Sequence, residues 1–275
     1  MTLIQRSNGL RENIPFLKWA GGKRWLSNRI LELMPSNFGT YFEPFLGGGA
    51  VYFSLNPSKA VLSDLNPNLI GTYAALRDSW EKVEKILRFH HKNHSKEHYY
   101  RLRKQSLRTA HTKAAQFIYL NRTCWNGLYR VNLSGNFNVP IGTKKNVILE
   151  TDNFLATSKR LRSAELHCRD FEITIDLATA GDVVFADPPY TVHHNNNGFV
   201  KYNENIFSWD DQIRLRDALV RARERGAKII MTNANHTSVR ELYKNDFEMG
   251  PISRMSVIAG SALARKKFEE LLIVS

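Results

Sequence analysis

The sequence predicts an α/β fold in which two separate parts of the chain form one doubly wound parallel sheet. Strand–turn–helix patterns fill about the first 75 residues, and the same rhythm returns after Leu166. Between these parts, helical spacing and positive charge dominate instead. We therefore expect a main domain over residues 1–76 and 164–275, with a helical lobe carrying a β-hairpin inserted over residues 77–163.

In the first part, a helical pattern over residues 23–34 stops at Pro35, and short apolar runs predict strands at residues 41–43 and 60–63. Asn66 followed by Pro67 is a typical helix start, here for a helix through Leu76. The remaining expected elements are helices over residues 81–89, 98–107, 113–121 and 209–225, the last between Ser208 as N-cap and Gly226 as stop, and strands over residues 166–168, 183–186, 228–232 and 269–274.

The positive charge of the chain is concentrated in the inserted lobe. The whole chain has a formal charge of +13. Residues 85–145 contain 13 Lys or Arg and a single acid, Glu97, which gives +12 and leaves the rest almost neutral. A solvated basic face would explain some of this charge, but its concentration favours a polyanion such as nucleic acid as partner.

Composition narrows the class of protein further. Apolar residues make up 43% and charged residues 24% of the 275 positions, which is ordinary for a globular protein. Two cysteines, Cys124 and Cys168, cannot form a disulfide framework, and no Cys/His spacing indicates zinc. No apolar signal core or membrane-length stretch occurs. We expect a soluble, cytoplasmic protein of a reducing compartment, monomeric when free, with no metal and no membrane partner.

Two glycine-containing segments could bind a ligand. Glu43 ends a predicted strand and runs through Phe45 into a triple-glycine turn, and Asp64 ends the next strand. Glycines allow close approach to the backbone, and a carboxylate at that strand end can accept hydrogen bonds from ribose hydroxyls, which fits a nucleoside cofactor as well as a plain turn. The segment from Lys18 to Lys23 places Trp19 and two glycines between lysines, as a lid over a ligand or as a helix start with a core tryptophan.

The four residues that follow the apolar run at 183–186 indicate a specific chemistry. The amino group on a purine ring is a poor nucleophile because its lone pair is delocalised. A carboxylate and a backbone carbonyl that accept its two protons would localise that lone pair, and an aromatic ring could stack on the base. Prolines would direct the carbonyl rigidly. The sequence supplies these groups in order, as Asp187, Pro188, Pro189 and Tyr190.

Taken together, these motifs resemble the Dam-type DNA adenine-N6 methyltransferases of bacteria and phages, over nearly the whole chain. The order of the motifs is that family's alpha arrangement, with the recognition lobe between the cofactor motif and the catalytic motif. The resemblance implies a Rossmann-like S-adenosylmethionine-dependent fold, double-stranded DNA as partner, base flipping and a GATC target. It implies catalytic roles for residues 187–190 and cofactor contacts for Trp19, Ala20, Gly21, Lys23, Glu43, Phe45, Asp64, Asp170, Phe171 and Asp187.

In the basic lobe the resemblance implies a hairpin that enters the duplex. Trp125 matches an aromatic wedge between base pairs, and Lys18, Leu128, Arg130 and Pro140 match base contacts. Thr123–Cys124 and Thr143–Lys144 depart from the family's usual pairs, so we expect a greater tolerance of near-cognate sites. The full set of expected DNA-binding residues is Lys18, Asn121, Arg122, Trp125, Asn126, Leu128, Arg130, Asn132, Asn138, Pro140 and Lys144.

Other groups were weighed against these. The histidines at positions 90, 91, 94 and 98 favour a solvated loop near phosphates over a metal site, because lysines interrupt them and only one carboxylate is near. The polar segment over residues 191–205 is expected to order when DNA binds. Rival functions are an RNA or protein-glutamine methyltransferase, a nicotinamide-dependent oxidoreductase and a regulator without catalysis. Titration with S-adenosylhomocysteine and with NAD distinguishes a methyltransferase from a nicotinamide-dependent oxidoreductase.

Overall fold

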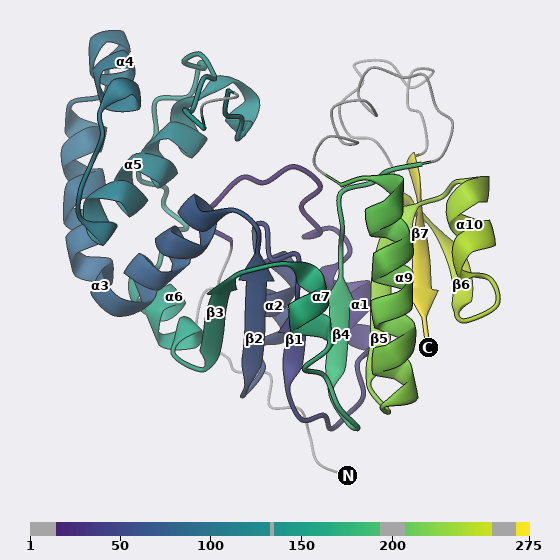
Figure 1. Ribbon diagram of the computed structural model, residues 1–275. Coiled ribbons are helices and arrows are strands. Elements are labelled where there is room, and N and C mark those ends of the chain that lie inside the picture. Colours follow the sequence, from purple (N-terminus) through teal and green to yellow (C-terminus); the bar gives the residue numbers. More distant parts are fainter. Residues whose placement is uncertain (1–14, 133–134, 193–206, 255–267) are drawn as a thin grey trace. The chain divides into compact units, whose positions relative to one another are not determined.

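The computed structural model describes residues 15–132, 135–192, 207–254 and 268–275 (Figure 1). The chain forms two compact units, and the boundaries fall inside the predicted main domain. The first unit comprises the residues up to Glu32, residues 47–56 and residues 66–166. The second comprises residues 33–46, 57–65 and 167–275. The N-terminal segment and the glycine turn thus group with the helical lobe, while the domain limits expected from the sequence stay a prediction.

The second unit is built on a seven-stranded sheet whose strands lie in the order β3-β2-β1-β4-β5-β7-β6. Pairing is parallel from β2 through β1 and β4 to β5, and β7 is antiparallel to both of its neighbours. The order reverses between β1 and β4, which is the switch point of a doubly wound fold and confirms the predicted class. The strands are β1 (Tyr41–Glu43), β2 (Ala60–Asp64), β3 (Ala164–Cys168), β4 (Val183–Ala186), β5 (Lys228–Ala234), β6 (Glu248–Arg254) and β7 (Phe268–Val274).

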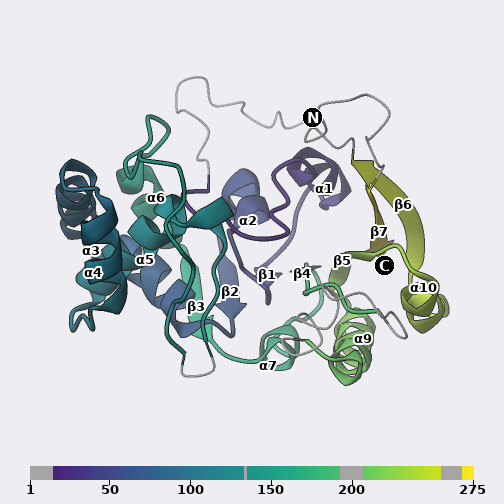
Figure 2. The same ribbon diagram turned by 90° about the horizontal axis from the view of Figure 1, so that it is seen from above.

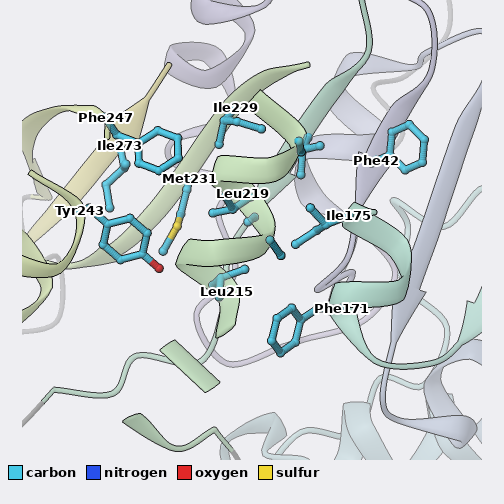
Figure 3. Packing of buried hydrophobic residues seen from close by; sticks show 14 of the residues in the cluster. Phe42, Phe171, Ile175, Leu215, Leu219, Ile229, Met231, Tyr243, Phe247 and Ile273 are labelled. Carbon is cyan, nitrogen blue, oxygen red and sulfur yellow. The ribbon is translucent and has the colours of Figure 1, made fainter. Parts of the chain in front are cut away.

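Helices α7 (Phe171–Ile175) and α9 (Trp209–Glu224) lie on the same side of this sheet (Figure 2). Their apolar side chains interlock with those of the strands, as Leu219 of α9 and Met231 of β5 show in Figure 3. Helix α10 (Thr237–Tyr243) extends the same core through its buried Tyr243. Fully burying such a side chain stabilises the fold by roughly 1.5–3 kcal/mol, so this core fixes the strand ends on which the site is built.

The predicted helix ends of the second unit are confirmed. The Ser208 hydroxyl accepts a hydrogen bond from the Asp211 backbone N–H, and the Asp211 carboxylate accepts one from the Ser208 backbone, which is a complete capping box. Gly226 lies just beyond the end of α9 and has a φ of +93°, a left-handed conformation that favours glycine. Sequence patterns missed α7, α10 and β6, because these segments are short or carry weak periodicity.

The first unit is helical. It contains α1 (Ser27–Leu33), α2 (Ala50–Leu55), α3 (Pro67–Lys92), α4 (Lys96–Lys104), α5 (Ala110–Thr123), the 3₁₀ turn η1 (Trp125–Gly127) and α6 (Phe154–Leu161). Asn66 caps α3 as predicted, accepting the N–H groups of Asn68 and Leu69. The two helices expected to end at Leu76 and to restart at Glu81 are confirmed as two helical segments of α3, separated by a kink where Ser79 leaves helical geometry with a φ of −153° and a ψ of 40°.

A hub of hydrogen bonds fastens the N-terminal segment to α5. The Arg122 guanidinium, 3% exposed, donates to the Phe16 carbonyl at 2.8 Å, to the Val147 carbonyl at 2.6 Å and to both oxygens of Asp152. Asn121 donates to the Lys18 carbonyl at 2.8 Å and accepts the Lys18 N–H at 2.9 Å. A buried, fully bonded pair of this kind is costly to break on one side only.

Two of the four histidines, His90 and His98, are buried, so the expectation of a solvated loop is wrong for them, whereas His91 is exposed and His94 is half-buried. His90 and His98 are 6% and 5% exposed. The Nδ1 atom of His90 lies 3.0 Å from the Nε2 atom of His98. His94 bonds the Tyr119 hydroxyl at 2.8 Å. Helices α3, α4 and α5 enclose the rings of His90 and His98, which both pack on Tyr119, so these two side chains are not available to phosphates. No group of three or more His, Cys, Asp or Glu suited to a metal ion occurs within the described ranges.

Two further sequence expectations concern the polar stretch after Tyr190 and the absence of a membrane-spanning segment. Of the polar stretch over residues 191–205 that was expected to order with DNA, all but the first two residues lie outside the described residues. In the part of the chain that is described, no helix is both long enough and apolar enough to cross a bilayer.

The buried histidines make the stability of the first unit sensitive to acid. Burial, and then the charge of His98, lower the pKa of His90 from 6.5 to about 4. Below pH 6.5 the unfolded chain therefore binds a proton that the folded chain does not, and stability is lost as the pH falls from 6.5 toward 4. We expect the free energy of unfolding in urea to fall by up to about 1.4 kcal/mol per pH unit for this group, and His90→Gln to flatten the slope.

His111→Gln is the matched control for this measurement, because His111 lies on α5 outside the cluster. An unchanged slope in His90→Gln would show that His90 does not govern the acid sensitivity.

Candidate functional site

Acidic side chains gather at one edge of the sheet in the second unit. Glu43 is the last residue of β1, Asp64 is the last residue of β2, and Asp187 follows β4 directly. Tyr41 pairs with both Ala60 and Val183, so these parallel strands run in step and their carboxyl ends meet at one edge. This edge flanks the switch point, where open α/β sheets bind ligands. Glu43 is 3% exposed and accepts the Tyr41 hydroxyl at 2.8 Å.

An aromatic pair lies beside these acids. The Phe45 ring stacks on the Phe171 ring at 5.3 Å and 26°. Asp170 caps α7 by accepting the Glu172 N–H at 2.9 Å, and Arg214 donates to the same carboxylate oxygen at 2.9 Å. An apolar ring surface next to fixed carboxylates suits a nucleoside, whose base is flat and whose ribose hydroxyls are donors.

The turn after β4 is held by two side chains from neighbouring strands. Thr232 of β5 donates a hydrogen bond to Asp187 Oδ1 at 2.7 Å. The Tyr190 hydroxyl donates to Glu270 Oε2 of β7 at 2.7 Å. Burial, followed by the negative charges of Asp187 and Glu270, raises the pKa of Tyr190 far above its usual range. Tyr190 therefore remains a neutral donor with its ring held in place, and the turn presents its polar groups in a defined geometry.

Thr232 and Glu270 were missed by sequence reasoning. Thr232 reaches the turn because β5 pairs with β4, and Glu270 reaches it because β7 inserts antiparallel beside β5, with Glu270 opposite Ala234. A signal did exist, since Glu270 is an acid in a strand of otherwise mostly apolar residues and its neighbour Glu269 is the other exception. A half-buried acid in a strand needs a partner, and Tyr190 is one.

The N-terminal segment of the first unit packs against the glycine turn. Gly47 has a φ of +48°, and a Cβ at this position would lie 2.8 Å from Cδ1 of Trp19. Glycine is therefore required both by the backbone and by the approach of the indole. Ala20 and Gly21 are exposed, whereas Lys23 is buried at 4% exposure. The predicted ligand residues of this segment thus lie together on a tight turn.

Two of the expected DNA contacts are corrected by the structure. Asn121 and Arg122 are 1% and 3% exposed, and their side chains bond the segment at residues 16–18 and Asp152. They cannot reach a nucleic acid without breaking this hub, so their role is structural. Sequence reasoning placed them with DNA because the surrounding lobe is so basic.

The remaining predicted contacts lie on an exposed hairpin. Trp125 and Leu128 are 53% and 47% exposed, which is unusual for large apolar side chains. Isolated bridges join Cys124 to Ile141 and Val131 to Phe137, so the two arms of the hairpin pair at its base and near its tip. Also exposed on this hairpin are Asn126, Arg130, Asn132, Asn138 and Pro140. Arg130 Nε donates to Asn138 Oδ1 at 2.9 Å, which orients the guanidinium.

Cys124 lies at the base of the hairpin and is no nucleophile. Its thiol is 3% exposed, and burial raises its pKa to about 11. A thiol in this state is protonated at neutral pH, so it behaves as a small core residue.

A basic cavity of about 480 Å³ lies beside the hairpin base. Its cationic lining consists of Lys18, Arg24, Lys144, Lys145 and the buried Arg122. Burial, and then the nearby ammonium of Lys144, lower the pKa of Lys18. The acid in this lining, Asp152, is already neutralised by Arg122. Like charges held this close favour an anion such as a phosphate.

Comparison with known proteins gives the class of this molecule. A family model described as D12 class N6 adenine-specific DNA methyltransferase matches residues 19–258. The chain is 36% identical over 285 residues to the Type II methyltransferase M1.LlaDCHI of Lactococcus lactis subsp. cremoris, covering all of this chain and 99% of that protein. This chain therefore belongs to the D12 class N6 adenine-specific DNA methyltransferases.

Further relatives are of the same kind. The Type II methyltransferase M.MjaIII of Methanocaldococcus jannaschii is 37% identical over 242 residues, which are 80% of this chain and 84% of that protein. The DNA adenine methylase of Vibrio cholerae serotype O1 is 31% identical over 268 residues, which are 96% of both chains. The resemblance to Dam-type enzymes is confirmed, and the protein is an adenine-specific DNA methyltransferase.

The hydrogen bond between Glu270 and Tyr190 gives a prediction about rate. We expect Tyr190→Phe and Glu270→Ala each to lower kcat for DNA methylation about tenfold or more while KM for DNA changes less than threefold, because a misplaced ring costs orientation, not affinity. In the double variant the second change should add little, since both remove one interaction.

Glu269→Ala is the control, because Glu269 is exposed on the same strand and bonds Asn235 instead. Fully additive losses in the double variant would contradict the shared interaction.

Proposed function

We propose that this enzyme transfers a methyl group from S-adenosylmethionine to adenine N6 within GATC in duplex DNA, on a base flipped out of the helix. The observation that carries the proposal is the turn at residues 187–190, which follows β4 and is held by Thr232 and Glu270. The exposed side chains of the hairpin support a sequence-specific DNA target. The basic cavity supports duplex DNA as the substrate.

The residues at the sheet edge fit S-adenosylmethionine. In the second unit Asp64 would accept the ribose hydroxyls, Asp170 and Phe171 would meet the adenine of the cofactor, and Glu43 with Phe45 would complete the pocket. In the first unit Trp19, Ala20, Gly21 and Lys23 are proposed to contact the cofactor. When bound, S-adenosylmethionine supplies an electrophilic methyl group on a sulfonium. The stacked pair of Phe45 and Phe171 and the capping carboxylate of Asp170 support this assignment.

The catalytic turn acts on the amine of the target base. Asp187 and the Pro188 carbonyl accept its two N–H protons, which localises the nitrogen lone pair toward the methyl donor. Thr232 orients the Asp187 carboxylate for this task. Tyr190 stacks on the flipped ring, and Pro189 stiffens the turn. The amine attacks while neutral, so no strong general base is needed and most of the rate comes from positioning.

Flipping follows from the geometry of the reaction. Inside the stack, N6 cannot lie in line with a sulfonium held by protein, so the adenine must leave the helix at a cost of a few kcal/mol. Trp125 is proposed to fill the gap, since it is 53% exposed at the start of the hairpin. Lys18, Leu128, Arg130 and Pro140 would contact bases. Asn126, Asn132, Asn138 and Lys144 would complete the interface, with Arg24 and Lys145 of the cavity near DNA phosphates.

Removal of the Asp187 carboxylate tests the chemical part of the proposal. Asp187→Ala should abolish methyl transfer to DNA, because the amine then loses the acceptor that localises its lone pair. Salt-sensitive DNA binding should survive, since the hairpin belongs to the other unit. A filter assay with labelled methyl donor and a gel-shift titration measure the two properties, with exposed Asp210→Ala as control. Activity within tenfold of the parent enzyme would refute the assigned role.

Variants of Arg130 and Lys145 together test the DNA-recognition part of the proposal. Arg130→Ala should relax preference at one base pair by roughly 1–3 kcal/mol, as expected for a bidentate contact with a guanine edge. Lys145→Ala should weaken binding to all sequences alike and reduce the slope of log K against log salt by about 0.9. Competition among duplexes with single substitutions in GATC measures both. Uniform weakening by Arg130→Ala would remove it from the base contacts.

A further inference from the structure

An aromatic ladder runs through the first unit from the glycine turn to the hairpin. The Trp19 ring stacks on the Tyr129 ring at 5.6 Å and 23°, and on the Phe117 ring at 6.3 Å and 29°. Tyr129 also contacts Phe117 at 5.1 Å and Phe137 at 5.8 Å. Phe137 pairs with Val131 across the hairpin. Each ring therefore touches the next, with Tyr129 at the centre.

Both ends of the ladder are fixed to parts of the site. Trp19 packs so tightly on the glycine turn that a Cβ at Gly47 would meet its ring at 2.8 Å. The Tyr73 hydroxyl donates to the Gly47 carbonyl at 3.0 Å, which holds the turn against α3. At the other end, Tyr129 lies between exposed Leu128 and exposed Arg130 in the chain. A shift of its ring must move the backbone that carries both neighbours.

Tyr129 has a second anchor on α3. Asn68, in the first turn of this helix, donates from Nδ2 to the Tyr129 hydroxyl at 3.1 Å. Asn68 also donates its N–H to the Asn66 side chain that caps the helix, two residues after Asp64. The ring of Tyr129 is thus held by stacking and its hydroxyl by a hydrogen bond, so the two contributions can be removed separately.

We propose that Tyr129 is a positioning residue that couples cofactor binding at Trp19 to reading of the DNA target by the hairpin. This rests on the proposed function, in which Trp19 contacts the cofactor and Leu128 and Arg130 contact bases. A ligand that orders Trp19 restricts the Tyr129 ring, and through it the hairpin, so cognate DNA then binds with less ordering left to do. Because such coupling is reciprocal, cognate DNA tightens cofactor binding by the same factor.

The ladder is more than core packing in one respect. A purely structural aromatic cluster would be sealed from the ligand-contacting surface, whereas Tyr129 is half-buried and directly follows a 47% exposed leucine. The segment at residues 16–18 is also held by Arg122 and Asn121, so the Trp19–Tyr129 stack is not what alone fastens it. Its removal should therefore change coupling before it changes folding.

The experiment is calorimetric titration of the full-length enzyme with S-adenosylhomocysteine, alone, with a GATC duplex, and with a duplex lacking the site. In the parent enzyme the GATC duplex should lower the Kd for S-adenosylhomocysteine at least fivefold relative to the other duplex. Tyr129→Ala and the larger Tyr129→Leu should bring this factor to within twofold of one, while the Kd without DNA stays within threefold of the parent value. Tyr129→Phe keeps the ring and should keep the coupling.

Tyr100→Ala is the matched control, since Tyr100 is a tyrosine of α4 that contacts Arg103 and lies outside the ladder. Thermal unfolding of each variant identifies any that fails to fold, and the two bulkier variants, Tyr129→Leu without the ring and Tyr129→Phe with it, still decide the question if Tyr129→Ala is unstable. Parent-like coupling in Tyr129→Leu, or no coupling in the parent enzyme, overturns the inference. Absence of any S-adenosylhomocysteine binding by the parent enzyme overturns the proposed function itself.

Discussion

Parallel pairing of β2, β1 and β4 is the constraint on which the chemistry of the second unit depends. Parallel strands end on the same side, so residues far apart in the chain arrive at one edge. Glu43, Asp64 and Asp187 share that edge because Tyr41 pairs with both neighbouring strands in step. The core under α7 and α9 then fixes the strands, and a shift of one residue in register would turn every side chain to the opposite face.

Antiparallel β7 adds what the parallel strands cannot supply. It inserts next to β5 and brings Glu270 to Tyr190, so the turn that we propose to be catalytic is held from two strands. A turn with two prolines is stiff in its backbone, but its side chains still need partners to keep a single orientation. Thr232 and Glu270 are those partners, and both belong to strands rather than loops, which makes the arrangement rigid.

Local motifs and long-range contacts differed in how well the sequence predicted them. The strand ends at Glu43 and Ala186, and the capping residues Asn66 and Ser208, depend on a few neighbouring positions and were predicted correctly. Thr232 and Glu270 depend on pairing between distant strands and were not found. The break in α3 at Ser79, by contrast, is local, and the sequence predicted the helical segments on either side of it.

The basic lobe shows why charge alone misassigns residues. Arg122 contributes to the positive charge of the lobe, but its guanidinium is already bonded to Asp152 and to two carbonyl groups. It therefore organises the lobe instead of binding an anion. Asn121 likewise binds the backbone of Lys18. The other cations that line the same cavity differ from Arg122 in being exposed. Burial and partners therefore separate structural cations from those suited to DNA.

The most direct test of the central claim is a map of N6-methyladenine in the genome of a host without adenine methylation that expresses this chain. The account predicts modification concentrated at GATC, with a minority at near-cognate sites, and none in a strain that expresses Asp187→Ala. Modification confined to another motif would contradict the recognition assignment and leave the catalytic one standing. A genome without N6-methyladenine, despite soluble and folded protein, would contradict the account of the catalytic turn.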